Sequence, residues 1–312
     1  MSRHSKYAVA VSILLLFVEL RAAQPHTTQL KLKTGRPVVE TYINGHGPYS
    51  FLVDTGTTSK LIISPRLAAN LKLKRVGAKR LSDAMQNGVI IGSVVGIDSI
   101  EVGGVRFAPC TALVSPLQSP GRRSIFDGIL GFDLFRDMLL TMDFRRHKLL
   151  LEKGNLPTVA DARVIPFQSK NGIPVIRIII NSQAIEAAID TGATGVMLPE
   201  TIAKTLQFAE TPVLMPRAET LVDQFDVHGA TLRGDIHLAA FDFEQPFVAI
   251  SPAVRIVNLG ADVFADFTVT FDEQSGQVRL DSPQILHRLR RKLESDLLED
   301  PPRFHHGVSP TQ

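Results

Sequence analysis

Two segments of the sequence each place an aspartate between two apolar runs and follow it with threonine and glycine. They are Phe51-Leu-Val-Asp-Thr-Gly-Thr-Thr-Ser-Lys-Leu-Ile-Ile-Ser64 and Ala187-Ala-Ile-Asp-Thr-Gly-Ala-Thr-Gly-Val-Met-Leu-Pro-Glu200. Two carboxyl groups within hydrogen-bonding reach cannot both ionise easily, so such a pair keeps one proton over a wide pH range. The ionised acid can then take a proton from water while the protonated acid hydrogen-bonds a carbonyl oxygen. If Asp54 and Asp190 meet, they therefore have the chemistry for attack of water on an amide without a covalent intermediate.

One such segment alone is weak evidence for a site. Asp-Thr-Gly also occurs in ordinary turns, where the aspartate accepts local hydrogen bonds and the glycine allows a tight bend. The apolar runs on both sides of Asp54 argue against a purely surface turn, because an acid rarely lies between two strand-like segments unless the fold keeps it there.

A second motif recurs after each aspartate at a similar spacing. Gly131 of Ile129-Leu-Gly131 follows Asp54 by 77 residues (131 − 54), and Gly260 of Asn258-Leu-Gly260 follows Asp190 by 70 residues (260 − 190). Two motifs in the same order at similar spacing indicate an internal duplication. If the two copies pack about a pseudo-twofold axis, their equivalent loops meet at that axis and bring the two acids face to face.

The alternation of apolar and polar residues, with frequent turn signals, predicts a mainly all-β fold. Short helices are expected over 65–73 and 199–206, and a length of 312 residues suits two domains. The predicted organisation is a signal peptide or N-terminal anchor over 1–23, a first lobe over 28–153, a linker over 154–163, a second lobe over 164–281, and an amphipathic helix with a disordered tail over 283–312.

Taken together, the two motifs make the sequence resemble the aspartic peptidases, and among them the retropepsin-like branch, over about residues 28–281. Each half resembles one retropepsin subunit, so the resemblance implies a bilobal pseudo-twofold fold with two barrel-like lobes. It also implies an endopeptidase that hydrolyses extended protein or peptide substrates. The resemblance also implies residue roles, with Asp54 and Asp190 as the catalytic pair, Thr55, Gly56, Thr191 and Gly192 in the active-site loops, and Gly131 and Gly260 in segments that support those loops.

A hairpin over 83–96 is the candidate substrate-binding flap, with Gln86, Asn87 and Gly88 at its tip. Asn-Gly readily takes the positive φ angles that tight hairpin turns need. This flap lacks the tyrosine of the pepsin branch and is more similar to the glycine-rich flap of retropepsins. A hairpin over 225–234 is a second candidate, and Asn258 stands where the resemblance expects an apolar residue.

The N-terminus has the layout of a secretory signal peptide: basic residues, an apolar run over 8–18, and small residues at 22 and 23. An uncleaved anchor is the alternative, and either one predicts an extracytoplasmic protein, periplasmic or secreted. The expected C-terminal helix has an apolar face opposite a basic face. Packing on the protein body is preferred, while contact of either terminal segment with a membrane surface stays open.

Composition argues against several other classes of function. A net charge of +3 and the lack of a basic groove with interleaved aromatics predict no nucleic-acid partner. No cysteine cluster, histidine ligand spacing or phosphate-loop glycine pattern occurs, so no metal and no cofactor are expected. Because both halves lie on one chain, a monomer can form the site. The main alternative is a peptide-binding or scaffolding protein on the same fold with weak or lost activity.

Overall fold

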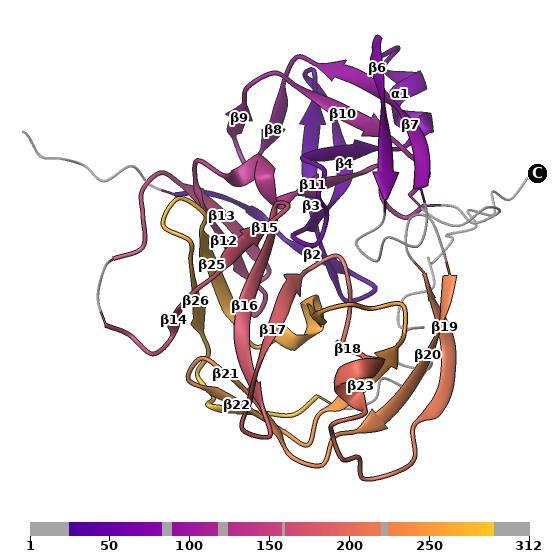
Figure 1. Ribbon diagram of the computed structural model, residues 1–312. Helices are drawn as coiled ribbons and strands as arrows, with labels where there is room; N and C mark the ends of the chain where they lie inside the picture. The colour runs from indigo at the N-terminus through magenta and orange to yellow at the C-terminus, as the bar shows by residue number, and fades with distance from the viewer. Residues whose placement is uncertain (1–24, 83–88, 118–123, 158–159, 220–223, 290–312) are drawn as a thin grey trace, which may run out of the picture.

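The computed structural model describes residues 25–82, 89–117, 124–157, 160–219 and 224–289. Strands dominate these residues, and they form two lobes, which lie above and below each other in Figure 1. The mainly all-β, bilobal fold predicted from the sequence is thereby confirmed. No helix within the described ranges is long and apolar enough to cross a membrane.

The described part of the first lobe is built on a ten-stranded sheet in the order β6-β7-β10-β5-β11-β4-β3-β8-β9, with β2 paired to β3. Its central strands are apolar because they are covered by protein, as in β5 and β11, where every residue is buried. The strands are β2 (Lys31–Lys33), β3 (Arg36–Ile43), β4 (His46–Asp54), β5 (Leu61–Ile63), β6 (Arg75–Ser82), β7 (Val89–Ile97), β8 (Ile100–Val102), β9 (Val105–Phe107), β10 (Cys110–Val114) and β11 (Gly128–Gly131).

The second lobe has the order β19-β20-β23-β18-β24-β17-β16-β21-β22-β27, with β15 paired to β16. Apart from the last strand, each position matches one in the first lobe, so the duplication extends to the strand order of both sheets. The strands are β15 (Gln168–Lys170), β16 (Ile173–Ile180), β17 (Gln183–Asp190), β18 (Val196–Pro199), β19 (Val213–Glu219), β20 (Gln224–Thr231), β21 (Asp235–Leu238), β22 (Phe241–Glu244), β23 (Phe247–Ser251), β24 (Val257–Gly260) and β27 (Leu286–His287).

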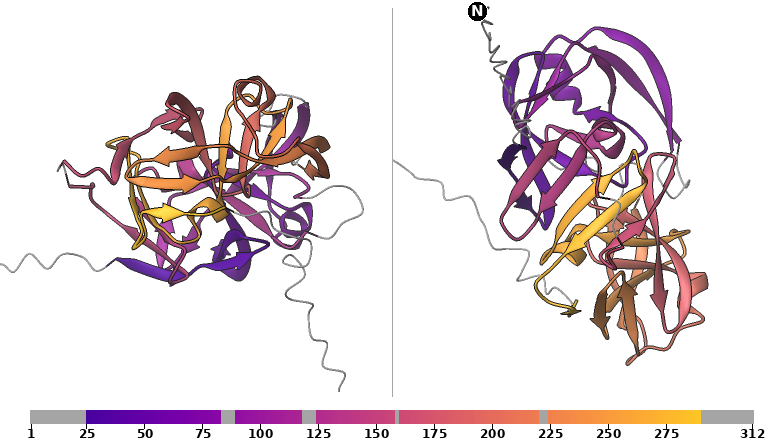
Figure 2. Two further views of the ribbon diagram at one scale, coloured as in Figure 1. Left: turned by 90° about the horizontal axis from the view of Figure 1, so that it is seen from below. Right: turned by 90° about the vertical axis from the view of Figure 1, so that its left-hand side faces the viewer.

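A third sheet joins the lobes, and the right-hand view of Figure 2 shows strands of both lobes lying together in it. Its order among the described strands is β1-β13-β12-β25-β26-β14, which is symmetric about the central β12–β25 pair. Thr141 pairs with Thr270 there, and their hydroxyls are 3.0 Å apart, which marks the pseudo-twofold axis. The strands are β1 (His26–Gln29), β12 (Leu139–Asp143), β13 (Lys148–Glu152), β14 (Val164–Pro166), β25 (Thr268–Asp272) and β26 (Gln277–Asp281).

Four short helical segments also occur in matching pairs within the described residues: α1 (Pro65–Asn70) with α2 (Glu200–Ala203), and the 3₁₀ turns η1 (Phe132–Phe135) with η2 (Ala261–Phe264). Helix α1 begins at Ser64, whose hydroxyl accepts a hydrogen bond from the amide of Leu67 at 3.1 Å. Both α-helices are shorter than the sequence pattern predicted.

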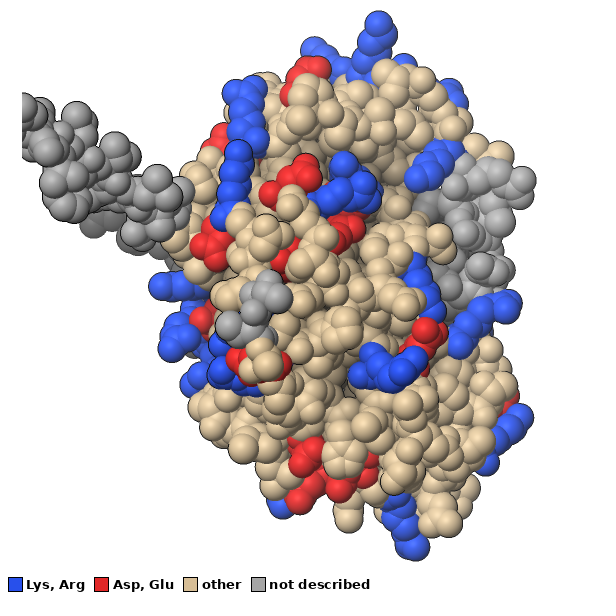
Figure 3. Space-filling view, turned by 60° about the vertical axis from the view of Figure 1, so that its left-hand side comes forward, with Lys and Arg blue, Asp and Glu red and all other residues tan. Residues whose placement is uncertain are grey.

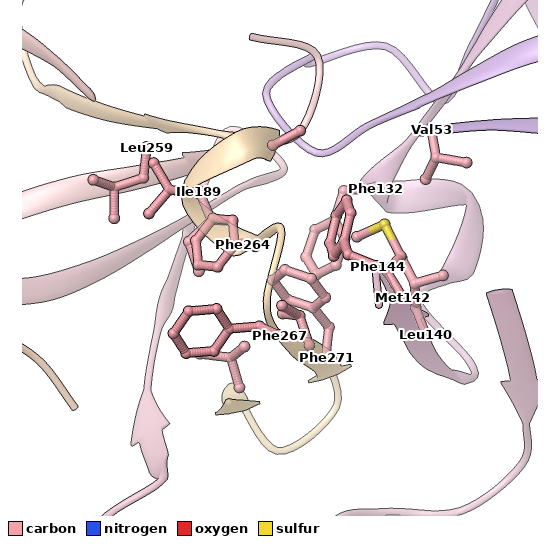
Figure 4. Packing of buried hydrophobic residues seen from close by; sticks show 14 of the residues in the cluster. Val53, Phe132, Leu140, Met142, Phe144, Ile189, Leu259, Phe264, Phe267 and Phe271 are labelled. Atoms are coloured by element: carbon pink, nitrogen blue, oxygen red, sulfur yellow. The ribbon is translucent and has the colours of Figure 1, made fainter. Parts of the chain in front are cut away.

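One hydrophobic core runs through both lobes and the sheet between them. Figure 4 shows Phe132 of the first lobe packing near Phe271 and Phe267 of the second. The ring centroids of Phe132 and Phe271 are 5.2 Å apart in an edge-to-face arrangement, and both side chains are almost fully buried. Burial of one such side chain stabilises a fold by roughly 1.5–3 kcal/mol, so this contact between the lobes stabilises both of them.

The prediction of a helix from Pro283 onward is wrong for the residues that the structure describes, which end at Leu289. Leu286 and His287 form strand β27, which pairs in parallel with β22 and adds an edge strand to the second sheet. The His287 ring is buried among the rings of Phe243 and Phe267, at centroid distances of 5.2 Å and 4.5 Å. This pairing and burial outweigh the helical spacing of the leucines. The remainder of that segment, like the predicted signal peptide, lies outside the described residues.

The surface turned to the reader in Figure 3 carries basic and acidic side chains interspersed among uncharged ones. The structure also contains exposed ion pairs, such as Lys170 with Glu186 at 2.7 Å. Exposed pairs of this kind contribute little to stability, so the fold depends mainly on its core and its sheets.

Candidate active site

The two Asp-Thr-Gly loops lie at equivalent ends of two equivalent strands. Strand β4 ends at Asp54 and β17 ends at Asp190. Each strand pairs in parallel with the segment that carries the second motif, so that Asp54 is opposite Gly131 and Asp190 is opposite Gly260. The Leu-Gly segments therefore lie directly beside the aspartate loops, where the resemblance implied that they would be.

Close backbone contact explains why glycine ends each of these segments. A Cβ atom on Gly131 would lie 2.0 Å from the carbonyl oxygen of Ser59, and one on Gly260 would lie 2.4 Å from the Cα of Thr194. Both neighbours belong to the chain that leaves the aspartate loop. A side chain at either position would push that loop out of place.

The threonines of the two loops bind each other's backbone across the pseudo-twofold axis. The Thr55 hydroxyl donates to the carbonyl of Ile189 at 2.7 Å and accepts from the amide of Thr191 at 3.0 Å. The Thr191 hydroxyl donates to the carbonyl of Val53 at 2.7 Å and accepts from the amide of Thr55 at 3.1 Å. Both threonines are buried. These four reciprocal bonds fix the distance and orientation between the loops.

The two carboxyl groups face each other, each packed against the glycine of the opposite loop. A Cβ atom on Gly56 would lie 2.2 Å from Cγ of Asp190, and one on Gly192 would lie 2.4 Å from Cγ of Asp54. Each glycine amide also donates to Oδ1 of the aspartate in its own loop, at 2.8 Å for Gly56 and 3.0 Å for Gly192. The structure thus brings together both predicted acids and all four predicted loop residues.

The electrostatic environment favours a shared proton. Part of the Asp54 surface stays accessible, yet protein surrounds its carboxyl on most sides, and this burial raises its pKa well above the ordinary value. The nearby charge of Asp190 and a hydrogen bond with its carboxyl raise the pKa of Asp54 further, whereas the Gly56 amide and the positive charge of Arg36 lower it. The pair therefore ionises as a unit, with one proton retained.

Arg36 is a charged neighbour that the sequence interpretation did not single out. Arg36 is the first residue of β3, and the strand registers of the two lobes show that its equivalent in the second copy is Ile173, the first residue of β16. Burial lowers the pKa of its guanidinium, and the charges of Asp54 and Asp190 raise it. The guanidinium lies 5.0 Å from the ring centroid of Phe126. An alignment of the two copies could have revealed Arg36, because the first copy has this cation where the second copy has Ile173.

Asn258 also touches the pair directly. Its Nδ2 donates to Oδ2 of Asp190 at 2.6 Å. The sequence comparison marked this position as a departure from the apolar pattern, but gave no function for it. Asn258 pairs with Ala188 in the register that places Gly260 beside Asp190, so it lies two residues before the glycine, as Ile129 does in the first lobe.

The predicted flap tip, formed by Gln86, Asn87 and Gly88, lies outside the described residues. The strands that lead to and from it, β6 and β7, form a long antiparallel hairpin. Strands β19 and β20 form the equivalent hairpin in the second lobe. In Figure 1 both hairpins lie along the same side of the molecule, and the strand ends at Ser82 and Val89 of the first point toward the strand ends at Glu219 and Gln224 of the second. Exposed apolar side chains occur on both, with Ile91 at 76% and Leu214 at 67% exposure.

Comparison with known proteins agrees with this arrangement. Residues 39–134 match the family described as aspartyl protease. That range contains the strand into Asp54, its loop, and the segment through Gly131. No curated protein matches the chain. The sequence and fold are therefore aspartic peptidase-like, and the match supports a protease-like function.

Proposed function

We propose that this protein is an aspartic endopeptidase in which Asp54 and Asp190 activate water against a peptide bond. The observation that carries the proposal is the placement of both carboxyl groups against each other's loop glycines, held by four reciprocal threonine hydrogen bonds. A peptide-binding protein has no need of such a pair, since two partly buried acids that face each other destabilise the fold.

The chemistry follows from one shared proton. The ionised carboxylate removes a proton from water, and the resulting hydroxyl attacks the peptide carbon while the protonated acid donates its proton to the carbonyl oxygen. In the tetrahedral diol, the first acid then carries the proton taken from water. It delivers that proton to the nitrogen as the C–N bond breaks, and the second acid takes back its proton from the diol. The products are a carboxylic acid and an amine, and the pair returns to its original protonation.

We propose extended protein or peptide segments as substrates. The β6–β7 and β19–β20 hairpins each expose a large apolar side chain, Ile91 and Leu214, that can contact an extended peptide. The signal-like N-terminus leads us to place the activity outside the cytoplasm, which fractionation of cells expressing the tagged full-length chain would test.

The direct test is to incubate the purified full-length protein with a mixed peptide library across about pH 3 to 8 and to identify the products by mass spectrometry. Cleavage that is lost in both Asp54→Asn and Asp190→Asn, but kept in Asp98→Asn, supports the proposal, because Asp98 is an exposed acid on the bend between β7 and β8. Absence of cleavage at every pH, with peptides still retained by the protein, would favour a peptide-binding function instead.

A further inference from the structure

The two halves of the site differ at one position that touches the reacting groups. Ile129 and Asn258 occupy equivalent places, each two residues before the glycine that pairs with an aspartate. Isoleucine has no hydrogen-bond donor, whereas the Asn258 amide donates to Oδ2 of Asp190. The duplication therefore supplies a side-chain donor to one acid of the pair and not to the other.

As a result, the two carboxyl groups differ in their hydrogen bonds. Asp190 accepts from the Gly192 amide on Oδ1 and from Asn258 on Oδ2, at 3.0 Å and 2.6 Å. Among the described residues, Asp54 accepts from the Gly56 amide on Oδ1, and its other hydrogen-bonding partner is Asp190 itself. Both oxygens of Asp190 thus face a neutral donor, which is the arrangement that stabilises a carboxylate.

Asn258 has a cost that isoleucine would not have. Its Oδ1 atom is buried and has no hydrogen-bond partner among the described residues. A buried acceptor without a partner destabilises a fold, and an apolar side chain of the Ile129 type would avoid that penalty. The bond from Nδ2 to Asp190 is the compensating interaction, and it points to a role in the site rather than in packing.

We propose that Asn258 is a positioning residue that keeps the single negative charge of the pair on Asp190, so that Asp54 holds the proton. Arg36, from β3, acts electrostatically on both acids, and its positive charge lowers the pKa of Asp54. This is the smallest of the effects on Asp54, and the effects that raise its pKa are larger. Burial and the charge of Asp190 raise the pKa of Asp54, in agreement with a protonated Asp54.

If the charge lies on Asp190, each acid has a fixed role in the first step of the reaction. This consequence rests on the proposed peptidase function. Asp190 removes the proton from water, and Asp54 donates its proton to the carbonyl oxygen of the substrate. A pair with two identical environments would divide these roles equally between its members. The amide of Asn258 therefore fixes which acid is the base when a substrate arrives.

The test separates the two acids by removing one at a time. In an Asp54→Asn background, carboxyl ¹³C NMR follows the titration of Asp190 alone, with the signal assigned by its loss in the Asp54→Asn, Asp190→Asn double variant. Adding Asn258→Ile, the first-lobe residue, is expected to move this titration to higher pH by about 1–2 units, because a hydrogen bond to a charged group is lost. In an Asp190→Asn background, the same change is expected to move the Asp54 titration by less than about 0.3 units.

A titration of Asp190 that stays in place or moves to lower pH on Asn258→Ile overturns the proposal, since the amide would then not stabilise the carboxylate. Circular dichroism and thermal unfolding verify that each variant folds, and Asn258→Ala replaces the isoleucine variant if the larger side chain does not fit. This measurement needs no catalytic activity, so failure of the peptidase proposal is seen separately, as an inactive wild type. In an active enzyme, Asn258→Ile should also move the acid limb of the kcat/KM profile upward by about 1–2 pH units with a smaller effect on KM.

Discussion

Replacement of Gly56 by alanine tests the geometry of the site most directly. A Cβ atom there would lie 2.2 Å from Cγ of Asp190, whereas ordinary contacts begin near 3.4 Å. The Asp190 carboxyl must therefore retreat by about 1.2 Å (3.4 − 2.2) from its place beside Asp54. The backbone at Gly56 lies outside the left-handed region, so the chain itself can accept alanine.

The fold should tolerate this change better than the chemistry does. The atoms that must move are the end of one side chain, and overpacking of this kind costs about 1–3 kcal/mol of stability. The same displacement separates the two carboxyl groups and disturbs the geometry that they need to activate a water molecule together. Since a misplacement of about 1 Å can lower a catalysed rate by about 100-fold, we expect kcat of Gly56→Ala to fall by at least that factor.

The assay compares kcat on a cleaved reporter peptide with thermal unfolding of the same preparations. Gly192→Ala, in which a Cβ atom would lie 2.4 Å from Cγ of Asp54, should behave like Gly56→Ala. Gly77→Ala is the matched control, because a Cβ atom there meets nothing within 4 Å. A Gly56→Ala protein that folds and keeps kcat within about fivefold of wild type would refute the arrangement of the pair described above.

Three further perturbations probe the same site. Because the folded-state pKa of Asp54 is raised, its stabilising contribution is present at acid pH, below about pH 4, and is lost as pH rises through the raised value. In thermal unfolding, Asp54→Asn should therefore be more stable than wild type at about pH 7, and this gain should disappear near pH 4. Absence of a gain at neutral pH would contradict this environment of Asp54. In urea unfolding, Thr55→Val should lower the free energy of unfolding by about 2–4 kcal/mol, because it leaves the buried Thr191 amide without its acceptor. Thr55→Ser keeps the hydroxyl and should stay within about 1 kcal/mol of wild type. Equal losses in the two variants would argue against a role of the hydroxyl. Arg36→Met removes a positive charge that lowers the pKa of Asp54, so Asp54 should keep its proton to higher pH and the alkaline limb of the pH–activity profile should move upward. A downward shift of that limb would show that the guanidinium does not act on the pair.

The sequence contains the information for the two lobes because that information is local and repeated. An apolar run must become a strand whose end carries Asp54 or Asp190, and the Leu-Gly segment must then pass beside that end without a side chain. Both requirements appear in short stretches of chain, so the duplicated pattern was enough to predict the fold and to bring the candidate acids together.

The shared sheet depends on contacts that no local pattern specifies. Its central pair joins β12 to β25, with Thr141 opposite Thr270, and these two residues lie 129 positions apart in the sequence. The C-terminal segment failed for a related reason. Its leucines have helical spacing, but an open sheet edge at β22 and an aromatic pocket for His287 decide its conformation, and both are formed by residues far away in the sequence.

The duplicated residues and the residues that differ between the copies have different roles in this site. The groups that fix distances are duplicated: the threonines bind each other's loops reciprocally, and each glycine amide binds its own aspartate. The side chain that distinguishes the acids is not duplicated, since the first copy has Ile129 at the position that Asn258 occupies in the second copy. Two identical subunits would have to place any new side chain on both acids at once. A single chain can change one copy alone, and Asn258 shows how such a change can give the two aspartates different protonation states without disturbing the frame that holds them.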